Sequence, residues 1–233
     1  MKLNFISLIL LVILSACSER PKNTLTVQGE VKGLKKGTLF LQKIQQGVLS
    51  TVDSTRLEGS GEYTLHASEG LGELHFLSLE KSNTNSIPFF GEAGTITINT
   101  NLEKFVLQAQ ISGSKNQEIL DKYNEISSKF QNQNLEMIKE KFEAQKAQDQ
   151  EKIAALATKE KQLLRRRYLY TANFALSHAD SEVAPYLALT VLTNANIKLL
   201  DTINKSLNDA IKNSTYGREL NSFLEEIKAE ELK

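Results

Sequence analysis

The order of hydrophobic and polar residues divides the sequence into two unlike parts. Between residues 24 and 113, apolar and polar positions alternate, as they do from Leu25 to Val31. Turn residues recur there about every eight to twelve positions, which is typical of an all-β domain. The alternation argues against a parallel sheet, whose strands are buried on both faces. We therefore predict an antiparallel β-sandwich or open barrel of about eight short strands over residues 24–113.

Two of the predicted strands have a special position. Pro88 falls within the apolar run from Ile87 to Phe90, and proline cannot donate a hydrogen bond to a neighbouring strand, so this segment should lie at a sheet edge. The segment from Phe105 to Ile111 is the last that the alternation predicts as a strand before the pattern changes.

At residue 114 the period becomes helical. Ser114 and Gln117 match a capping box at a helix start, and Ile119, Tyr123, Ile126 and Phe130 then form one apolar stripe, spaced four, three and four residues apart. Residues 131–152 are polar but contain no proline or glycine, which predicts a long helix that is either kinked or projecting.

The remaining sequence predicts further helices. A second periodic segment runs from Ile153 to Phe174, and Asp180 or Ser181 should begin the next helix, with Pro185 in its first turn, where the missing N–H costs little. Helices are expected over residues 184–192, 198–211 and 216–232. The predicted fold class is therefore α+β: the β domain at 24–113 followed by an all-α region at 114–233.

The first residues have the pattern of a secretory leader. Lys2 supplies a positive charge, residues 5–14 an apolar run, and Ser15 and Ala16 the small residues before a cleavage site. The sequence Leu-Ser-Ala-Cys at 14–17 resembles the bacterial lipobox, in which the cysteine receives a diacylglyceryl group and further acylation. We expect a signal peptide at 1–16, and a lipidated Cys17 with a polar tether at 17–23. The alternative is an ordinary signal peptide with an incidental cysteine.

Composition limits the chemistry that the chain can perform. Lys and Arg together number 28, as do Asp and Glu. A nucleic-acid partner would be expected to require a basic excess, so none is predicted. Cys17 is the only cysteine, and if it carries lipid then no thiol remains for a disulfide or a dithiol redox centre.

Few residues suggest a catalytic or metal site. His66 and His75 could lie on neighbouring strands, but no third ligand completes a metal site, and none is predicted. His178 and Asp180 lie close in sequence to serines, yet a catalytic triad is defined by geometry and not by adjacency. A helix-capping loop is the simpler interpretation, and we keep His178 and Asp180 as candidate partner or pocket contacts. Arg165, Arg166 and Arg167 should point to different sides of a helix and face solvent.

Four short segments resemble a known family. They are Val27–Val31, Val52–Tyr63, Ile111–Asn116 and Phe174–Tyr186. In this order they resemble the domain of unknown function that precedes the thioredoxin domain of TlpA-like thiol–disulfide interchange lipoproteins of Gram-negative envelopes. In the last segment Ala179 stands where that family has proline. The longer relatives continue into a thioredoxin domain with Cys-x-x-Cys, and this sequence ends at Lys233 without one.

The resemblance and the residues together favour a non-enzymatic protein. The resemblance implies an accessory module of the Gram-negative envelope, held to the inner or outer membrane by lipid on Cys17. Its expected work is to bind or assist an envelope protein partner, with no cofactor. The alternative is an envelope enzyme or small-ligand binder with a pocket between the β-sandwich and the helices, near His178.

Overall fold

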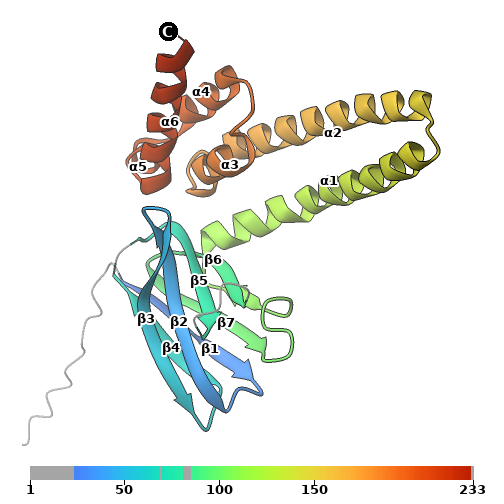
Figure 1. Ribbon diagram of the computed structural model, residues 1–233. Coiled ribbons are helices and arrows are strands. Elements are labelled where there is room, and N and C mark those ends of the chain that lie inside the picture. The colour runs from blue at the N-terminus through green and yellow to red at the C-terminus, as the bar shows by residue number, and fades with distance from the viewer. Residues whose placement is uncertain (1–23, 69, 81–84, 232–233) are drawn as a thin grey trace, which may run out of the picture.

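The computed structural model describes residues 24–68, 70–80 and 85–231, and it has a β-sandwich at one end and helices at the other (Figure 1). The leader, Cys17 and the whole of the tether lie outside the described residues. The strands are β1 (Leu25–Lys32), β2 (Lys36–Gln45), β3 (Val48–Glu58), β4 (Glu62–Ala67), β5 (Glu73–Leu79), β6 (Ser86–Gly91), β7 (Gly94–Asn101) and β8 (Gln110–Ser112).

The eight strands form two four-stranded sheets, in the orders β4-β1-β7-β8 and β3-β2-β5-β6. All pairs are antiparallel except β1 with β7, which run parallel from Leu25 opposite Gly94. The inward-facing residues of both sheets fill one core that includes Leu25, Leu41 and Phe89. The predicted β-sandwich is therefore confirmed. The strand β6, which contains Pro88, lies at a sheet edge as the sequence predicted.

The predicted strand at residues 105–111 is largely wrong. Only Gln110–Ser112 forms a strand, and turns occupy residues 102–108. The alternation that suggested a strand has another cause, because the turn buries Phe105 and leaves Leu107 86% exposed. The Thr100 hydroxyl donates to the carbonyl of Phe105 at 2.7 Å, which holds this turn against β7.

Six helices follow the sheets: α1 (Lys115–Lys146), α2 (Gln150–Ser177), α3 (Val183–Val191), α4 (Ile197–Ser206), α5 (Asp209–Lys212) and α6 (Thr215–Glu231). The α1 start is as predicted, since the Ser114 hydroxyl accepts from the Gln117 N–H at 3.0 Å. The predicted helix over 198–211 is two helices, because Asn208 accepts from the Ile211 N–H and begins α5.

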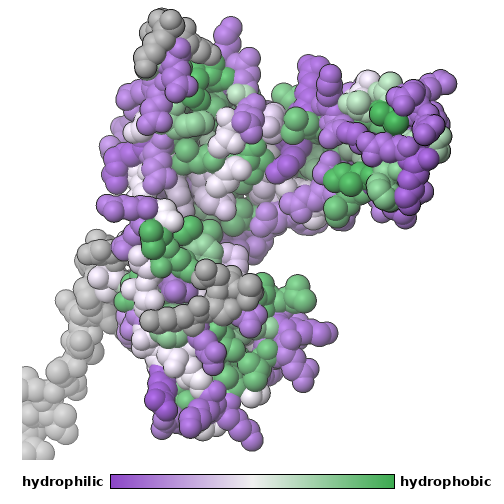
Figure 2. Space-filling model, in the orientation of Figure 1, coloured by the Kyte–Doolittle hydropathy of each residue, from purple (hydrophilic) through white to green (hydrophobic). Residues whose placement is uncertain are grey.

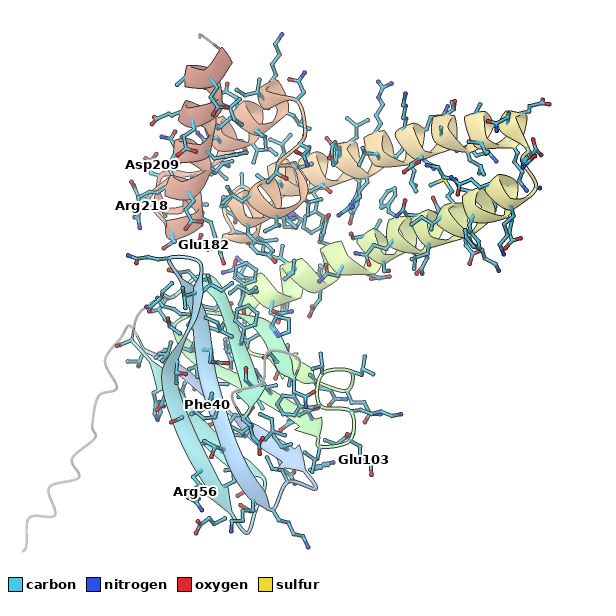
Figure 3. The ribbon with its side chains drawn as sticks, in the orientation of Figure 1. Phe40, Arg56, Glu103, Glu182, Asp209 and Arg218 are labelled. Atoms are coloured by element: carbon cyan, nitrogen blue, oxygen red, sulfur yellow. The ribbon has the colours of Figure 1, made fainter. Side chains whose placement is uncertain are left out.

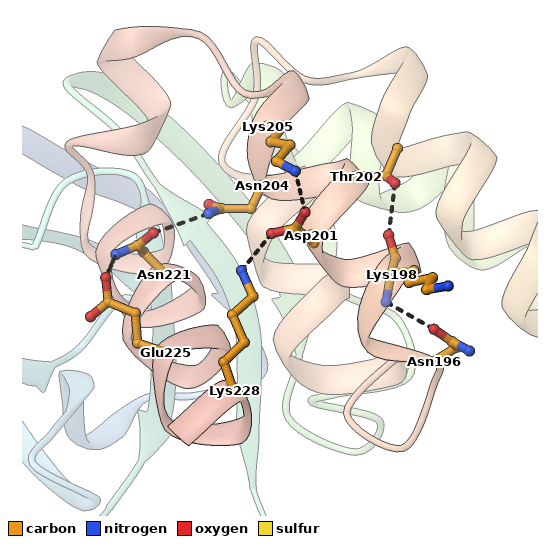
Figure 4. A network of polar contacts seen from close by, with 9 residues as sticks. All are labelled: Asn196, Lys198, Asp201, Thr202, Asn204, Lys205, Asn221, Glu225 and Lys228. Carbon is orange, nitrogen blue, oxygen red and sulfur yellow. Dashed lines mark hydrogen bonds and ion pairs between the residues drawn. The ribbon is translucent and has the colours of Figure 1, made fainter. Parts of the chain in front are cut away.

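The helices α3 to α6 form a small bundle against the base of α2 (Figure 1). On the outer side of the bundle, Asp201 of α4 accepts a hydrogen bond from Lys228 of α6 at 2.8 Å. Asp201 also forms an ion pair with Lys205 (Figure 4). Hydrogen bonds from these two lysines, Lys205 first, lower the pKa of the Asp201 carboxyl. The bundle is thus joined by an apolar core within and by exposed ion pairs outside.

A third apolar cluster joins the sandwich to the helices. Phe90 of β6 is fully buried against Leu120 and Tyr123 of α1 and Val183 and Leu187 of α3. Its ring also meets the rings of Tyr186 and Tyr216 edge to face, with centroids 5.3 and 6.2 Å away. Such geometry favours aromatic pairs beyond the area they bury. Phe90 is therefore the central apolar contact between the two parts.

Replacing Phe90 by alanine should weaken this junction. We expect Phe90→Ala to lower the free energy of unfolding by about 3–5 kcal/mol, because it removes a buried aromatic ring and leaves a cavity. Urea unfolding followed by circular dichroism measures the loss. Leu107→Ala removes an exposed side chain and should stay within about 0.5 kcal/mol of the wild type. Equal losses in both variants would contradict the importance given to Phe90.

Candidate functional site

Two regions are candidates for function: the junction between sandwich and helices, and the projecting pair of helices α1 and α2, which we call the arm. The junction is held by polar bonds as well as by the Phe90 cluster. The Phe90 N–H donates to Gln117 Oε1 at 3.0 Å, and the Leu74 N–H donates to the Tyr216 hydroxyl at 3.0 Å. Side chains from distant parts of the sequence thus accept hydrogen bonds from backbone N–H groups of the sheet.

Acidic side chains gather on one side of this junction. Thr215 donates to Glu73 Oε1 at 2.8 Å, and Lys43 Nζ lies 3.8 Å from Glu73 Oε2. Glu182 lies nearby, between the top of the sandwich and the helices (Figure 3). Burial raises the pKa of Glu182, a hydrogen bond from Ser214 opposes the shift, and the charge of Glu73 adds to it. Its Oε2 atom has no hydrogen-bond partner among the described residues.

The three histidines lie apart. His66 on β4 is near Thr26, with Nδ1 3.3 Å from its hydroxyl, whereas His75 on β5 belongs to the other sheet. His75 is fully buried, which lowers its pKa, and its Nδ1 donates to the Glu73 carbonyl at 3.0 Å. Within the described ranges no group of His, Cys, Asp and Glu is placed to hold a metal ion.

His178 and Asp180 lie in the loop between α2 and α3. His178 follows the last residue of α2 as its C-cap, its Nδ1 donates to the Phe174 carbonyl at 2.8 Å, and its ring stacks on the Phe174 ring at 4.2 Å. Asp180 is exposed. The neighbouring Ser181 bonds Asn116 of α1 instead, at 2.7 Å. The capping role of His178 was predictable from sequence, and neither residue lines a described hollow.

The hollows that the structure describes lie away from the junction. Three line the arm, one lies beside the turn before β8, and one lies between α4 and α6. The junction itself is filled by the Phe90 cluster. The expected pocket between sandwich and helices thus has no counterpart among these hollows.

The arm has a firmly packed root. Tyr123 of α1 stacks on Tyr170 of α2, with ring centroids 5.6 Å apart, and its hydroxyl is hydrogen-bonded to that of Thr171 at 2.9 Å. Phe130 continues the aromatic contacts, 5.7 Å from Tyr170. The root therefore fixes the direction in which both helices leave the body of the protein.

Beyond Phe130 the two helices meet through few apolar contacts. The fully buried hydrophobic residues described there are Ala144, Leu156 and Leu163. Residues 131–134 are glutamines and asparagines, all exposed, where a self-sufficient helical pair would carry apolar residues. At about 1.5 Å per residue, the 32-residue α1 extends some 48 Å. The arm is thus a long projection with a thin core.

Large apolar side chains instead face outward on the arm. Leu135, Ile138, Phe142 and Leu164 are 63%, 55%, 54% and 45% exposed. Green patches among purple ones along the projecting arm show this in Figure 2. Exposed apolar groups gathered on one element mark an interaction surface more often than isolated ones do.

Two different grooves run along the arm. One, which we call the polar groove for its charged residues, has a volume of 670 Å³ and is lined by Glu136, Glu140, Lys159 and Arg166 together with Leu135, Met137 and Leu163. The other comprises hollows of 200 and 390 Å³ that share Asn134 and Glu160 and are lined by the exposed apolar residues. Sequence reasoning predicted the projecting helix but missed this apolar side. The spacing of Leu135, Ile138 and Phe142, three and then four residues apart, was the available signal.

Comparison with known proteins gives one match, which covers the sandwich and the start of the arm. A two-sheet sandwich followed by helices is an α+β architecture. Residues 25–120 match the family model described as a domain of unknown function (DUF4369). This is in agreement with the resemblance to a domain of unknown function, and the match carries no information on a thioredoxin context. No curated protein and no solved structure matches the chain significantly.

The packing of the arm predicts opposite results for two neighbouring leucines. Leu163 is 5% exposed and Leu164 is 45% exposed. Leu163→Ala should destabilise the pairing of α1 with α2 by about 2 kcal/mol, the low end for such a change because the distal core is thin. Leu164→Ala should change it by less than about 0.5 kcal/mol. Hydrogen exchange of the amides of α1 and α2 measures both, and faster exchange in Leu164→Ala alone would refute the assignment.

Proposed function

We propose that this chain is a lipid-anchored, non-catalytic accessory protein of a Gram-negative cell envelope, and that the arm is the part that contacts other envelope components. The observation that carries the proposal is the arm itself, a rigidly rooted projection with large apolar side chains exposed. A helical pair with a thin core of its own gains stability by packing against something else.

The anchor rests on the leader sequence. A bilayer-spanning helix needs about 20 apolar residues, and the apolar run at residues 5–14 is about half as long. Among the helices that the structure describes, none has the length and hydropathy needed to span a bilayer. Two or more acyl chains on Cys17 would supply stable attachment, since each buried methylene contributes about 0.8 kcal/mol.

The polar groove of the arm is where we place an envelope protein partner. Glu136 and Glu140 of α1 face this groove together with Lys159 and Arg166 of α2. Both signs of charge are therefore available within one hollow, which a protein surface can complement residue by residue. A possible role in an envelope redox or surface-assembly system follows from the resemblance stated for the sequence.

Replacing Cys17 tests the anchor. Cys17→Ser removes the thiol that lipid modification needs, so the protein should leave the membrane fraction or accumulate unprocessed. Fractionation of cells and immunoblotting measure the shift. Lys22→Ala, in the same polar segment, keeps the thiol and should remain in the membrane. Retention of Cys17→Ser in detergent-extractable membranes at the wild-type level would contradict lipid anchoring.

Charge reversal in the polar groove tests the partner. Tagged protein, solubilised from membranes and purified, should recover the same envelope protein repeatedly. The pair Glu136→Lys and Glu140→Lys should lose it, because both carboxylates face the groove. Glu103→Lys, in the turn before β8 far from the arm (Figure 3), is the matched control and should keep it. Recovery of no protein above background, or equal recovery by all variants, would argue against the proposal.

A further inference from the structure

The apolar side of the arm forms one surface. Its apolar residues come from both helices: Leu135, Ile138 and Phe142 from α1 and Leu164 from α2. The two hollows on this side share Asn134 and Glu160, so the four side chains border one continuous surface.

Basic residues border this surface on its outer edges. At 3.6 residues per turn, Lys139 and Lys146 lie beside the α1 stripe, and Lys161 and Arg165 lie beside Leu164. All four are exposed. The ammonium of Lys146 lies 4.3 Å from the centroid of the Phe142 ring, which places a cation directly over the apolar stripe. We call this surface, with its four apolar and four basic residues, the apolar-basic face.

Acidic residues balance only part of this charge, since the Glu143 carboxylate lies 3.5 Å from Lys146 Nζ. The Glu160 carboxylate there is paired with Lys141 at 3.0 Å, which leaves the pair neutral. Glu136 and Glu140 face the opposite, polar groove. Arg167 lines one of the apolar hollows, and its Nε has no hydrogen-bond partner among the described residues. Helix α2 as a whole carries six basic residues and two acidic ones. Lys139, Lys161 and Arg165 remain outside these two ion pairs, so the apolar-basic face carries a net positive charge.

This charge decides between the possible occupants. A second copy packed face to face would bring four basic side chains against four others, and juxtaposed like charges oppose association. An apolar strip bordered by Lys and Arg is instead the pattern of helices that lie in the interface of a bilayer with anionic lipids. The apolar side chains enter the headgroup region, and the cations remain at the level of the phosphates.

The position of the arm agrees with a lipid surface. Thr24, the first described residue, accepts through its carbonyl from the Gly94 N–H at 2.9 Å, at the start of β7. A Cβ on Gly113, one residue before the cap of α1, would lie 2.4 Å from the Thr95 carbonyl oxygen. The chain thus enters the sandwich and the arm leaves it at the same end. The six residues between Cys17 and Thr24 extend at most about 20 Å, so an anchored Cys17 holds this end near the headgroups.

We propose that the apolar-basic face of the arm lies against the anionic headgroups of the membrane in which the protein is anchored. The location of this contact rests on the proposed lipid anchor. The charge and the exposed apolar residues of the face do not depend on the anchor. Contact with the bilayer orients the arm and leaves its polar groove open on the other side. Each basic residue near an anionic surface strengthens binding about fivefold.

Site-specific fluorescence tests the contact. The protein, purified from membranes of cells that express the full-length chain, carries an environment-sensitive fluorophore on Ile138→Cys, in the apolar-basic face, or on Gln162→Cys, in the polar groove. Each is mixed with vesicles of phosphatidylcholine alone or with added phosphatidylglycerol. With phosphatidylglycerol the label at 138 should shift to the blue and be quenched by nitroxide lipids, and the label at 162 should do neither. High salt should reverse the shift, because it screens the surface charge.

A charge variant and flotation separate this inference from the anchor. Lys161→Gln combined with Arg165→Gln should reduce the blue shift at 138 without changing flotation. Flotation with both vesicle types but no shift at 138 would overturn the contact and leave the anchor standing. Flotation only with phosphatidylglycerol, with a reactive Cys17 thiol, would refute the anchor and support the contact. No flotation with either would refute both.

Two further outcomes would assign the face to another occupant. A blue shift that grows with protein concentration in the absence of vesicles would show that a second copy covers it. A shift that phosphatidylglycerol does not produce but an acidic envelope protein does would show that the occupant is that protein. Either result would overturn the lipid contact.

Discussion

The orientation of the arm depends on how one edge of the sandwich is joined to the helices. Phe90 on the edge strand β6 is buried among residues of α1 and α3, and its N–H is satisfied by Gln117. Stacked aromatic rings at Tyr123 and Tyr170 then hold α1 against α2. Without this junction the two helices would have no fixed direction, because their distal halves bury few apolar side chains.

The arm combines a rigid root with an incomplete core, and the proposed contacts rest on this combination. The bundle of α3 to α6 packs near the base of α2, and the outward apolar residues of the distal arm stay exposed. Charge then separates two sides. The acidic residues Glu136 and Glu140 face one groove, while basic residues outnumber acidic ones along the other. This difference is the basis for proposing a protein partner on one side and an anionic lipid surface on the other.

Much of the fold could be predicted because local signals agreed with tertiary packing. Alternation reported which face of each strand is buried, Pro88 marked the edge strand, and Ser114 marked the start of α1. Prediction failed where an alternating pattern had another cause. Phe105 is buried by a turn held by Thr100, and a helical period continued across Asn208 although that residue begins a new helix. Apolar spacing indicates burial, and it does not distinguish a strand from a turn that folds back.

The sequence by itself determined the β-then-α order, the long α1 and the resemblance to a domain of unknown function, because these depend on local periodicity and short segments. Only the tertiary structure decided that β1 and β7 run parallel, that His66 and His75 belong to different sheets, and that the junction is filled. It also decided that Leu163 faces inward and Leu164 outward. The physical reason is that the burial of a side chain depends on which helix or strand packs against it. The pattern of apolar residues along the sequence does not specify that helix or strand.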